Sequence, residues 1–434
     1  MTRVVVAGPQ DRGDLRFPRG PHPPRTSHTN EIIRRAMSSR NNSFHEAPSA
    51  PIRFGAFIAP FHPLEGNPTL QLRRDLELAE LLDELGFDEV WFGEHHSTGV
   101  ELIMSPEVMI AAAGERTKRI RLGTGVSSVC YHNPLILANR ILQLDHMTQG
   151  RVMMGIGPGQ LPSDAFMMGI EPRKQRDMMA EAIEALVPLL RGETVTLKTD
   201  WFDLREAQSQ LRPFNPNGIP VAVGSVFSPT GVTLAGRHGL GVLSLAAGDQ
   251  RAANGLAAAW ATHEKVAADH GHVAERENWR VVNQVHLSTS TSRARDDLEF
   301  GVLRTTRFLE TFSDTELPWR STPHSAIEEW TTNGLPSWGR IIAGTPQDAI
   351  HRIEELVDKS GGFGTFLYSI ADCAPWDATK RSLQLFAEYV MPHFKRANAN
   401  RESSLAWAHS NRALHLGEMA AAIDEATNKY SHSS

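Results

Sequence analysis

Hydrophobic and polar positions follow two periods that replace one another along the chain from residue 52 onward. Short runs of β-branched and aromatic residues are apolar at consecutive positions, as in strands that are buried on both faces. The longer segments between them repeat apolar residues every three to four positions, as on one face of a helix. The predicted strands are residues 52–58, 87–94, 120–128, 151–157, 219–225, 240–246, 279–288 and 363–370.

Helix end signals support the segments between the strands. The first helical segment ends at Gly86, and glycine readily adopts the left-handed conformation that closes a helix. The second begins with Ser105 as its cap and Pro106 at its first position. Strands that alternate with helices in this way predict the α/β class and a (β/α)8 TIM barrel. An open sheet would normally carry a glycine-rich nucleotide loop after its first strand, and "GAFIAPFHP" has none.

The longest interruption of this pattern, residues 289–362, separates the seventh and eighth strands. It contains Trp319, Trp330 and Trp338 among many polar residues. We predict an insertion here. Long loops on barrels often act as lids, and a packing insertion or an oligomer contact is the alternative.

Length and composition bound the organisation of the chain. Its 434 residues suffice for one barrel domain, predicted over 51–396, with extensions at both ends. Residues 1–50 are rich in proline, arginine and glycine without apolar periodicity, which predicts a disordered N-terminal arm. Residues 397–434 are predicted to form a helical tail.

Charge and cysteine content argue against several classes of protein. The net charge of −6 gives no reason to expect nucleic acid or an anionic membrane as partner. No apolar stretch approaches the roughly 20 residues that a membrane-spanning helix needs. Two cysteines, Cys130 and Cys373, cannot build a disulfide framework or a zinc cage. These features predict a cytoplasmic protein.

The segment "GEHH" follows the second predicted strand. Active sites of (β/α)8 barrels lie at the C-terminal ends of the strands, so Glu94, His95 and His96 are predicted to project into the barrel mouth. Neighbouring side chains of an extended segment point opposite ways, so the two imidazoles could not easily bind one metal ion. We expect no metal, one imidazole facing the cavity as a base or hydrogen-bond donor, and the other buried behind it.

Two further loops have the composition of ligand-binding segments. Residues 155–166 are glycine-rich, which lets backbone approach a flat ligand, although ordinary turns have the same composition. Residues 223–239 lead into a helix with Ser225, Ser228 and Thr230 around its start. Hydroxyls and free amides there suit a phosphate, and an ordinary helix cap at Ser228 is the alternative.

Four stretches in this order resemble the bacterial luciferase-like flavin-dependent monooxygenases: "FDEVWFGEHHST", "IRLGTGVSSVCYHNPLILANRILQLDHMTQGRVMMGIGPG", "VAVGSVFSPTGVTLAGRHGLG" and "AGTPQDAIHRIEEL". The resemblance covers about residues 52–395 and is nearest to limonene 1,2-monooxygenase-type members. It implies a two-component enzyme to which a separate flavin reductase supplies reduced FMN (FMNH2). Through a flavin C4a-(hydro)peroxide, such an enzyme uses O2 to oxygenate a small hydrophobic substrate, for example a terpene, an aldehyde or an alkane-like molecule.

The resemblance also implies roles for single residues. His95 matches the catalytic histidine of the family, Glu94 would support it, and His96 would be structural. The implied flavin contacts are His132 and Asn133, the loop of Gly157, Pro158, Gly159 and Gln160 beside the isoalloxazine, and Gly224, Ser225, Ser228 and Thr230 at the phosphate.

Bacterial luciferase has a Cys–Arg pair where this chain has Gly157 and Pro158, so aldehyde-dependent light emission is not expected. The phosphate would then need more hydroxyl contacts or another cation, for which Arg173 and Arg237 are candidates. An oxygenating site must exclude water. Candidate walls of the substrate pocket are Phe57, Phe61, Met104 and the tryptophans of the insertion, each of which could equally serve packing.

Two alternatives remain open. A deazaflavin-dependent dehydrogenase of the same superfamily would share the barrel and several motifs but transfer a hydride without O2. A non-catalytic flavin-binding protein is the third hypothesis. Family members commonly assemble, which implies a homodimer or a higher homo-oligomer.

Overall fold

The computed structural model describes residues 52–59, 61–226, 228–310, 322–335, 338–370 and 372–431. The predicted N-terminal arm and Trp319 lie outside this described part. Within it, a parallel sheet closes on itself because β8 pairs with β9 as well as with β7. Its strands are β1 (Arg53–Ile58), β2 (Glu89–Phe92), β3 (Arg121–Ser128), β4 (Val152–Gly157), β7 (Val221–Ser225), β8 (Gly241–Ser244), β9 (Trp279–Leu287) and β11 (Thr365–Ile370).

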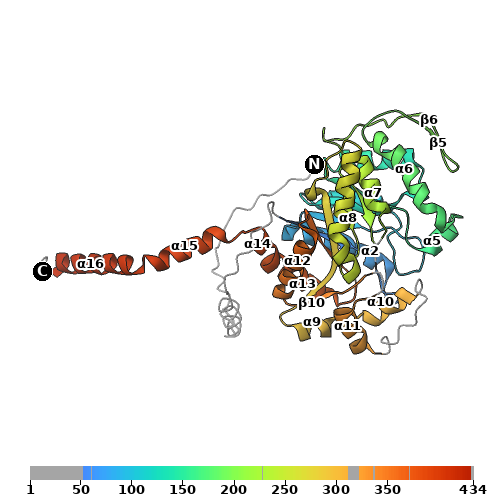
Figure 1. The fold of residues 1–434 in the computed structure, drawn as a ribbon. Coiled ribbons are helices and arrows are strands. Elements are labelled where there is room, and N and C mark those ends of the chain that lie inside the picture. The colour runs from blue at the N-terminus through green and yellow to red at the C-terminus, as the bar shows by residue number, and fades with distance from the viewer. Residues whose placement is uncertain are drawn as a thin grey trace, which may run out of the picture. The chain divides into compact units, whose positions relative to one another are not determined.

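These strands are the ones that the hydrophobic pattern predicted, and the (β/α)8 barrel is confirmed (Figure 1). A further strand, β10 (Ile342–Gly344), pairs with β9 alone. The pair β5 (Val195–Lys198) and β6 (Asp203–Ala207) forms a separate antiparallel hairpin.

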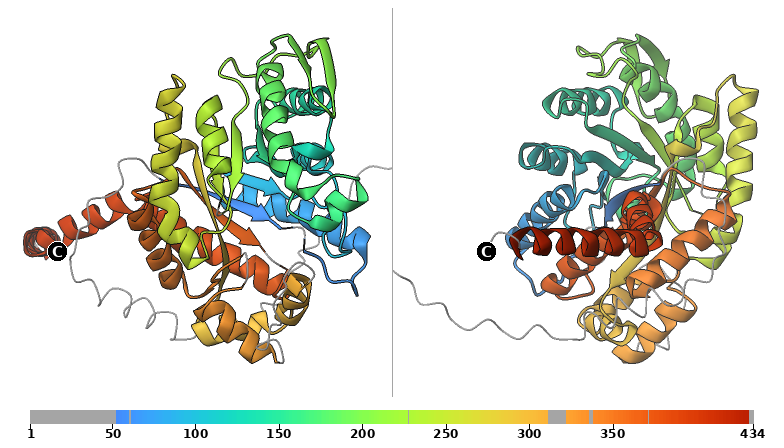
Figure 2. Two further views of the ribbon diagram at one scale, coloured as in Figure 1. Left: turned by 45° about the vertical axis from the view of Figure 1, so that its right-hand side comes forward. Right: turned by 90° about the vertical axis from the view of Figure 1, so that its left-hand side faces the viewer.

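Helices surround the barrel (Figure 2). Several begin with a capping residue followed by proline, as at Asn67, Asn133 and Thr345. Ser105 occupies the predicted cap position, but its hydroxyl bonds Glu107 instead of a backbone amide. The helices that alternate with the strands are α2 (Pro68–Leu85), α3 (Pro106–Arg116), α4 (Pro134–Met147), α6 (Gln175–Leu190), α7 (Thr230–His238), α8 (Gln250–Asp269), α12 (Pro346–Ser360) and α13 (Trp376–Leu385).

Short elements occupy several loops. They are η1 (Val129–Tyr131), α5 (Pro162–Met167), η2 (Pro172–Lys174), η3 (Arg276–Asn278), η6 (Phe386–Val390) and α14 (Met391–Phe394). None of the helices in the described part is long and apolar enough to span a bilayer.

A buried ion pair lies inside the barrel. Arg280 donates to both carboxylate oxygens of Glu89, at 2.9 and 3.0 Å, and both side chains are at most 2% exposed. The Arg280 guanidinium also lies over the ring of Trp91. Burial removes both charges from water, and the two parallel hydrogen bonds between them compensate for this loss of hydration.

The predicted insertion is helical. It consists of α9 (Thr291–Leu298), α10 (Val302–Leu309) and α11 (Pro323–Thr332), which lie together in Figure 1. Their apolar residues form a second hydrophobic core that also includes Phe61 and Leu161. The ring of Phe61 packs edge-on against Phe308 at 4.4 Å between centroids and against Trp338 at 5.5 Å. The insertion therefore packs on the loops at the C-terminal ends of β1 and β4.

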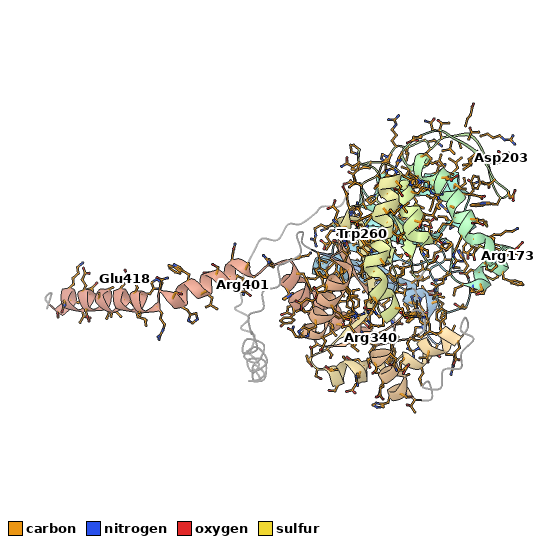
Figure 3. The ribbon with its side chains drawn as sticks, in the orientation of Figure 1. Arg173, Asp203, Trp260, Arg340, Arg401 and Glu418 are labelled. Atoms are coloured by element: carbon orange, nitrogen blue, oxygen red, sulfur yellow. The ribbon has the colours of Figure 1, made fainter. Side chains whose placement is uncertain are left out.

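The C-terminal segment forms α15 (Ala399–Ser410) and α16 (Arg412–Ser431), neither of which has a buried residue. Figure 3 shows side chains, Arg401 and Glu418 among them, extending from these two helices.

Candidate active site at the barrel mouth

Backbone hydrogen bonds fix the segment that follows β2. The amide of Gly93 donates to the carbonyl of Ile58, and the amide of His95 donates to Ile103. Glu101 forms an antiparallel bridge with Phe61 on the loop after β1. Residues 93–103 therefore form a fixed loop at the C-terminal ends of β1 and β2.

Glu94 is the centre of one hydrogen-bond network. Its Oε1 accepts from Nε2 of His96 and Nε2 of His132, both at 2.9 Å, and its Oε2 accepts from the Ser128 amide at 2.8 Å. Arg140 donates to Nδ1 of His132, which fixes the proton of a neutral His132 on Nε2. Burial raises the pKa of Glu94, but these hydrogen bonds outweigh it and hold that pKa at about 2.

His95 belongs to a different network. Its Nδ1 lies 3.3 Å from Oδ2 of Asp164, and its Nε2 lies 3.6 Å from Oε1 of Glu101. The expectation that Glu94 supports His95 is therefore wrong, because Glu94 bonds His96 and His132. The expectation that one imidazole is buried behind the other is wrong, because the side chains of His95 and His96 are 19% and 20% exposed.

Two carboxylates at His95 were missed in the sequence. Asp164 lies in α5, within the glycine-rich stretch 155–166 that was singled out for its backbone, and its acidic side chain was the available signal. Its Oδ1 also accepts from the His96 amide at 3.2 Å and from the Ser97 hydroxyl. Glu101 belongs to no motif, and only folding brings it to His95.

The two carboxyls beside His95 differ in charge. Burial raises the pKa of Asp164, but hydrogen bonds from His95 and Ser97 outweigh it, so that pKa is lowered. Glu101 is 8% exposed, and its Oε2 has no hydrogen-bond partner among the residues that the structure describes. Burial, with a smaller contribution from Asp164, raises the pKa of Glu101 to about 7, although His95 and His62 act in the other direction.

The phosphate candidates meet at the start of α7. Ser225 ends β7, the Ser228 and Thr230 hydroxyls are 2.8 Å apart, and the Thr230 amide donates to Ser228 at 3.3 Å. The next amides, of Gly231 and Val232, have no acceptor within the helix, because the first turn never does. This set of hydroxyls and amides fits a flavin phosphate.

The two candidate cations are not part of that set. Arg237 lies in the last turn of α7, at the opposite end from Thr230. Arg173 is 84% exposed and pairs with Glu171. The first turn of α7 therefore offers a phosphate hydrogen bonds and the helix dipole.

The loop after β4 approaches Tyr131 closely. Gly159 has a φ of +88°, and a Cβ atom there would come within 2.3 Å of the Tyr131 hydroxyl. Gln175 donates to the carbonyl of Pro158 at 2.8 Å and holds the loop. Glycine is therefore required at 159 by the contact with Tyr131 and by the backbone conformation, while the implied isoalloxazine contact of this loop stays a prediction.

The remaining expected contacts have mixed surroundings. Asn133 caps α4 through Oδ1 and so has a structural role, whereas His132 joins the Glu94 network. Phe57 packs inside the barrel, Phe61 is buried under the insertion, and Met104 is 62% exposed. Of the three candidate pocket walls, Phe61 alone lies between the mouth and the insertion.

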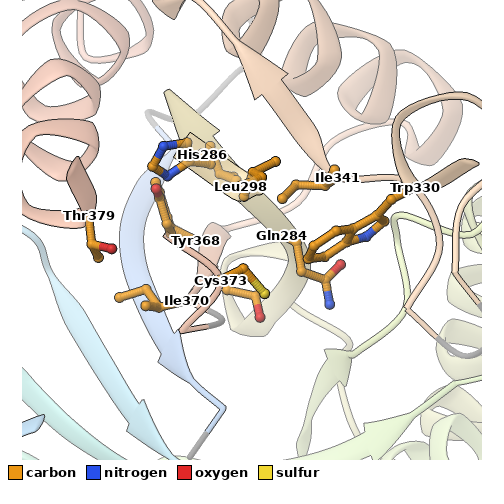
Figure 4. A pocket seen from close by; sticks show the side chains of 11 residues that line it. Gln284, His286, Leu298, Trp330, Ile341, Tyr368, Ile370, Cys373 and Thr379 are labelled. Atoms are coloured by element: carbon orange, nitrogen blue, oxygen red, sulfur yellow. The ribbon is translucent and has the colours of Figure 1, made fainter. Parts of the chain in front are cut away.

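A separate small cavity lies between β9, β11 and the insertion, with His286, Tyr368, Cys373 and Trp330 among its lining residues (Figure 4). Its volume of about 10 Å³ accommodates at most one water molecule, so it is not a flavin or substrate site. Across the described ranges, no three His, Cys, Asp or Glu side chains are grouped to hold a metal ion.

Comparison with known proteins decides the family. The luciferase-like monooxygenase model matches residues 52–362. The chain belongs to the luciferase-like monooxygenase family. It is 42% identical to 4-hydroxyprotoasukamycin monooxygenase of Streptomyces nodosus subsp. asukaensis, over 82% of this chain and 96% of that protein. It is also 42% identical to limonene 1,2-monooxygenase of Rhodococcus erythropolis, over 79% of this chain and 87% of that protein.

A solved structure shares the fold of this luciferase-like monooxygenase. The monooxygenase RslO1 from Streptomyces bottropensis superimposes with a TM-score of 0.66 at 25% identity, covering 79% of this chain and all of that one. The chain is thus an enzyme of the monooxygenase class.

Proposed function

We propose that this chain is the oxygenase of a two-component system that uses reduced FMN and O2 to oxygenate a small hydrophobic molecule, such as a terpene, an aldehyde or an alkane-like compound. The observation that carries the proposal is His95, held at the barrel mouth between Asp164 and Glu101. Identity of 42% to two monooxygenases, one of which is named for limonene, supports the reaction type and the substrate class.

FMN would be held by Ser225, Ser228, Thr230 and the first amides of α7 at its phosphate, with the Gly157–Gln160 loop and His132 toward the ring. Bound reduced FMN supplies the two electrons that activate O2, so that one oxygen atom enters the substrate and the other becomes water.

The chain's own residues orient the His95 ring and move a proton at its Nε2. Because the pKa of Asp164 is lowered, its carboxylate accepts a hydrogen bond from Nδ1–H of His95 and fixes the ring. Nε2 is then left to take up or release a proton at the mouth. Phe61 and the insertion exclude water on one side of this site, since their aromatic rings are packed together.

Two partners belong to the proposal. A flavin reductase would deliver reduced FMN, because the motif set is that of two-component enzymes. The protein would work as a homodimer or a higher homo-oligomer, as relatives of this fold commonly do.

The test is isotope incorporation. The purified chain is supplied with FMN, NADH and a purified flavin reductase under ¹⁸O2, with limonene and a panel of aldehydes and alkanes as probes. We expect one ¹⁸O atom in the product of at least one probe, only when FMN is present. Turnover that requires reduced deazaflavin and introduces no label would instead identify a dehydrogenase.

A further inference from the structure

We propose that Glu101 is a positioning residue that shares one proton with Nε2 of His95, so that the mouth of the barrel stores a proton next to the reaction site. The motif resemblance points to His95 but not to Glu101, whose role follows from its surroundings. This inference rests on the proposed function only in placing the reaction at His95.

The geometry indicates which ring nitrogen of a neutral His95 carries the proton. Since Nδ1 faces the Asp164 carboxylate at 3.3 Å, the proton of a neutral ring lies on Nδ1, and Nε2 presents its lone pair. Oε1 of Glu101 lies 3.6 Å from this nitrogen. A small movement of either side chain brings the two atoms to hydrogen-bond distance.

The location of Glu101 keeps its proton from bulk water. The side chain is 8% exposed, and its backbone is bridged to Phe61, whose ring is packed under α10. Within the described part of the chain, its Oε2 is buried without a hydrogen-bond partner, which is costly for an ionised carboxylate but acceptable for a neutral carboxylic acid.

The charged groups around Glu101 come from three elements. His62 lies on the loop after β1, His95 on the loop after β2, and Asp164 on α5. Burial dominates over all three and raises the pKa of Glu101 to about 7, so the carboxyl gains and loses its proton near neutral pH.

The transfer itself is a simple acid–base step. The proton leaves the carboxyl oxygen of Glu101, the O–H electron pair stays behind as carboxylate, and the Nε2 lone pair forms the new N–H bond. Asp164 stabilises the resulting imidazolium from the other side. No electrons are exchanged with a redox partner, and the reverse step restores the acid.

The test is titration of His95 in the flavin-free protein, which separates it from the test of the proposed function. Protein with ¹⁵N-labelled histidine rings is followed by NMR from about pH 5 to about pH 9, a range that brackets the pKa of Glu101. The His95 signals are identified by their loss in His95→Asn. We expect a step in the pH profile of the Nε2 shift whose midpoint is displaced in Glu101→Gln, because the variant removes the carboxyl that shares the proton.

Asp145→Asn is the matched control. Asp145 is a buried carboxyl whose pKa is also raised by burial, but it lies in the last turn of α4 and accepts from the Phe214 amide. This variant should keep the wild-type midpoint of the Nε2 profile. A His95 titration that is the same in wild type and Glu101→Gln would overturn the proposal.

Glu101→Asp guards against misfolding of the Gln variant. The shorter side chain retains a titrating carboxyl but moves it away from Nε2, so we expect the step to persist with a displaced midpoint. An unchanged midpoint in a folded Glu101→Asp protein would also refute a shared proton.

Discussion

His95 lies between two carboxyl groups whose pKa values are shifted in opposite directions. The ionised Asp164 fixes the ring, while Glu101 can carry a proton at neutral pH. Glu94, the acidic residue of the motif itself, is occupied with His96 and His132. The motif thus contributes two separate networks through adjacent residues.

His95→Ala should reduce formation of the oxygenated product by about 10²-fold or more, the usual contribution of a general acid–base group. FMN binding, followed by quenching of flavin fluorescence, should stay near that of wild type. The His95 side chain belongs to the loop after β2 and not to the hydroxyls and amides at the start of α7. Near-normal product formation in this variant would remove His95 from the mechanism.

Glu101→Gln should change how stability depends on pH. Because the pKa of Glu101 is raised to about 7 in the folded chain, the stability that its proton contributes is full below about pH 4.5 and is lost as pH rises through 7. Relative to wild type, the Gln variant should therefore gain on the order of 3 kcal/mol in unfolding free energy between these limits.

Urea unfolding at a series of pH values measures this difference. Glu80→Gln, at a surface pair with Arg116, is the control and should show little pH dependence. A constant offset between Glu101→Gln and wild type across the range would contradict the buried, titrating carboxyl.

The start of α7 illustrates what a single element can contribute. The pattern of Ser225, Ser228 and Thr230 before a helix suited either a phosphate site or an ordinary helix cap, and the structure brings the last two hydroxyls within 2.8 Å of each other. The end of the same helix rules Arg237 out of this set, since helix length separates the two ends.

Removing both hydroxyls in a Ser228→Ala, Thr230→Ala variant should raise the Kd for FMN by about 10²-fold or more, because hydrogen bonds to a charged group are worth about 1.5–3 kcal/mol each. Isothermal titration calorimetry measures the change. Ser290→Ala is the matched control, since Ser290 caps α9 and is not part of the cradle. Equal losses of affinity in both proteins would show that the α7 hydroxyls do not bind the phosphate.

The whole molecule combines a closed barrel, a helical insertion and a two-helix C-terminal segment. The insertion has its own hydrophobic core and reaches the mouth through Phe61, which favours the lid interpretation over a peripheral packing role. The helices α15 and α16 contribute no buried residue to any core.

Deleting residues 397–434 should shift the Tm of the remaining chain by less than about 2 °C, because stability comes from buried contacts and this segment supplies none. Differential scanning calorimetry of the full and shortened chains measures the shift. A drop of 10 °C or so would mean that the segment is covered in the assembled protein.

By itself, the sequence determined the order of strands and helices, because burial on both faces of a parallel barrel leaves a periodic pattern in each segment. It also determined that Glu94, His95 and His96 reach the barrel mouth, since strand ends and working face coincide in this fold. Only the tertiary structure decided which acid serves which imidazole. His95, Glu101 and Asp164 belong to different segments, and local periodicity contains no information about the distances between them. The proton affinity of Glu101 likewise depends on burial by residues distant in the chain, and desolvation is a property of the assembled fold.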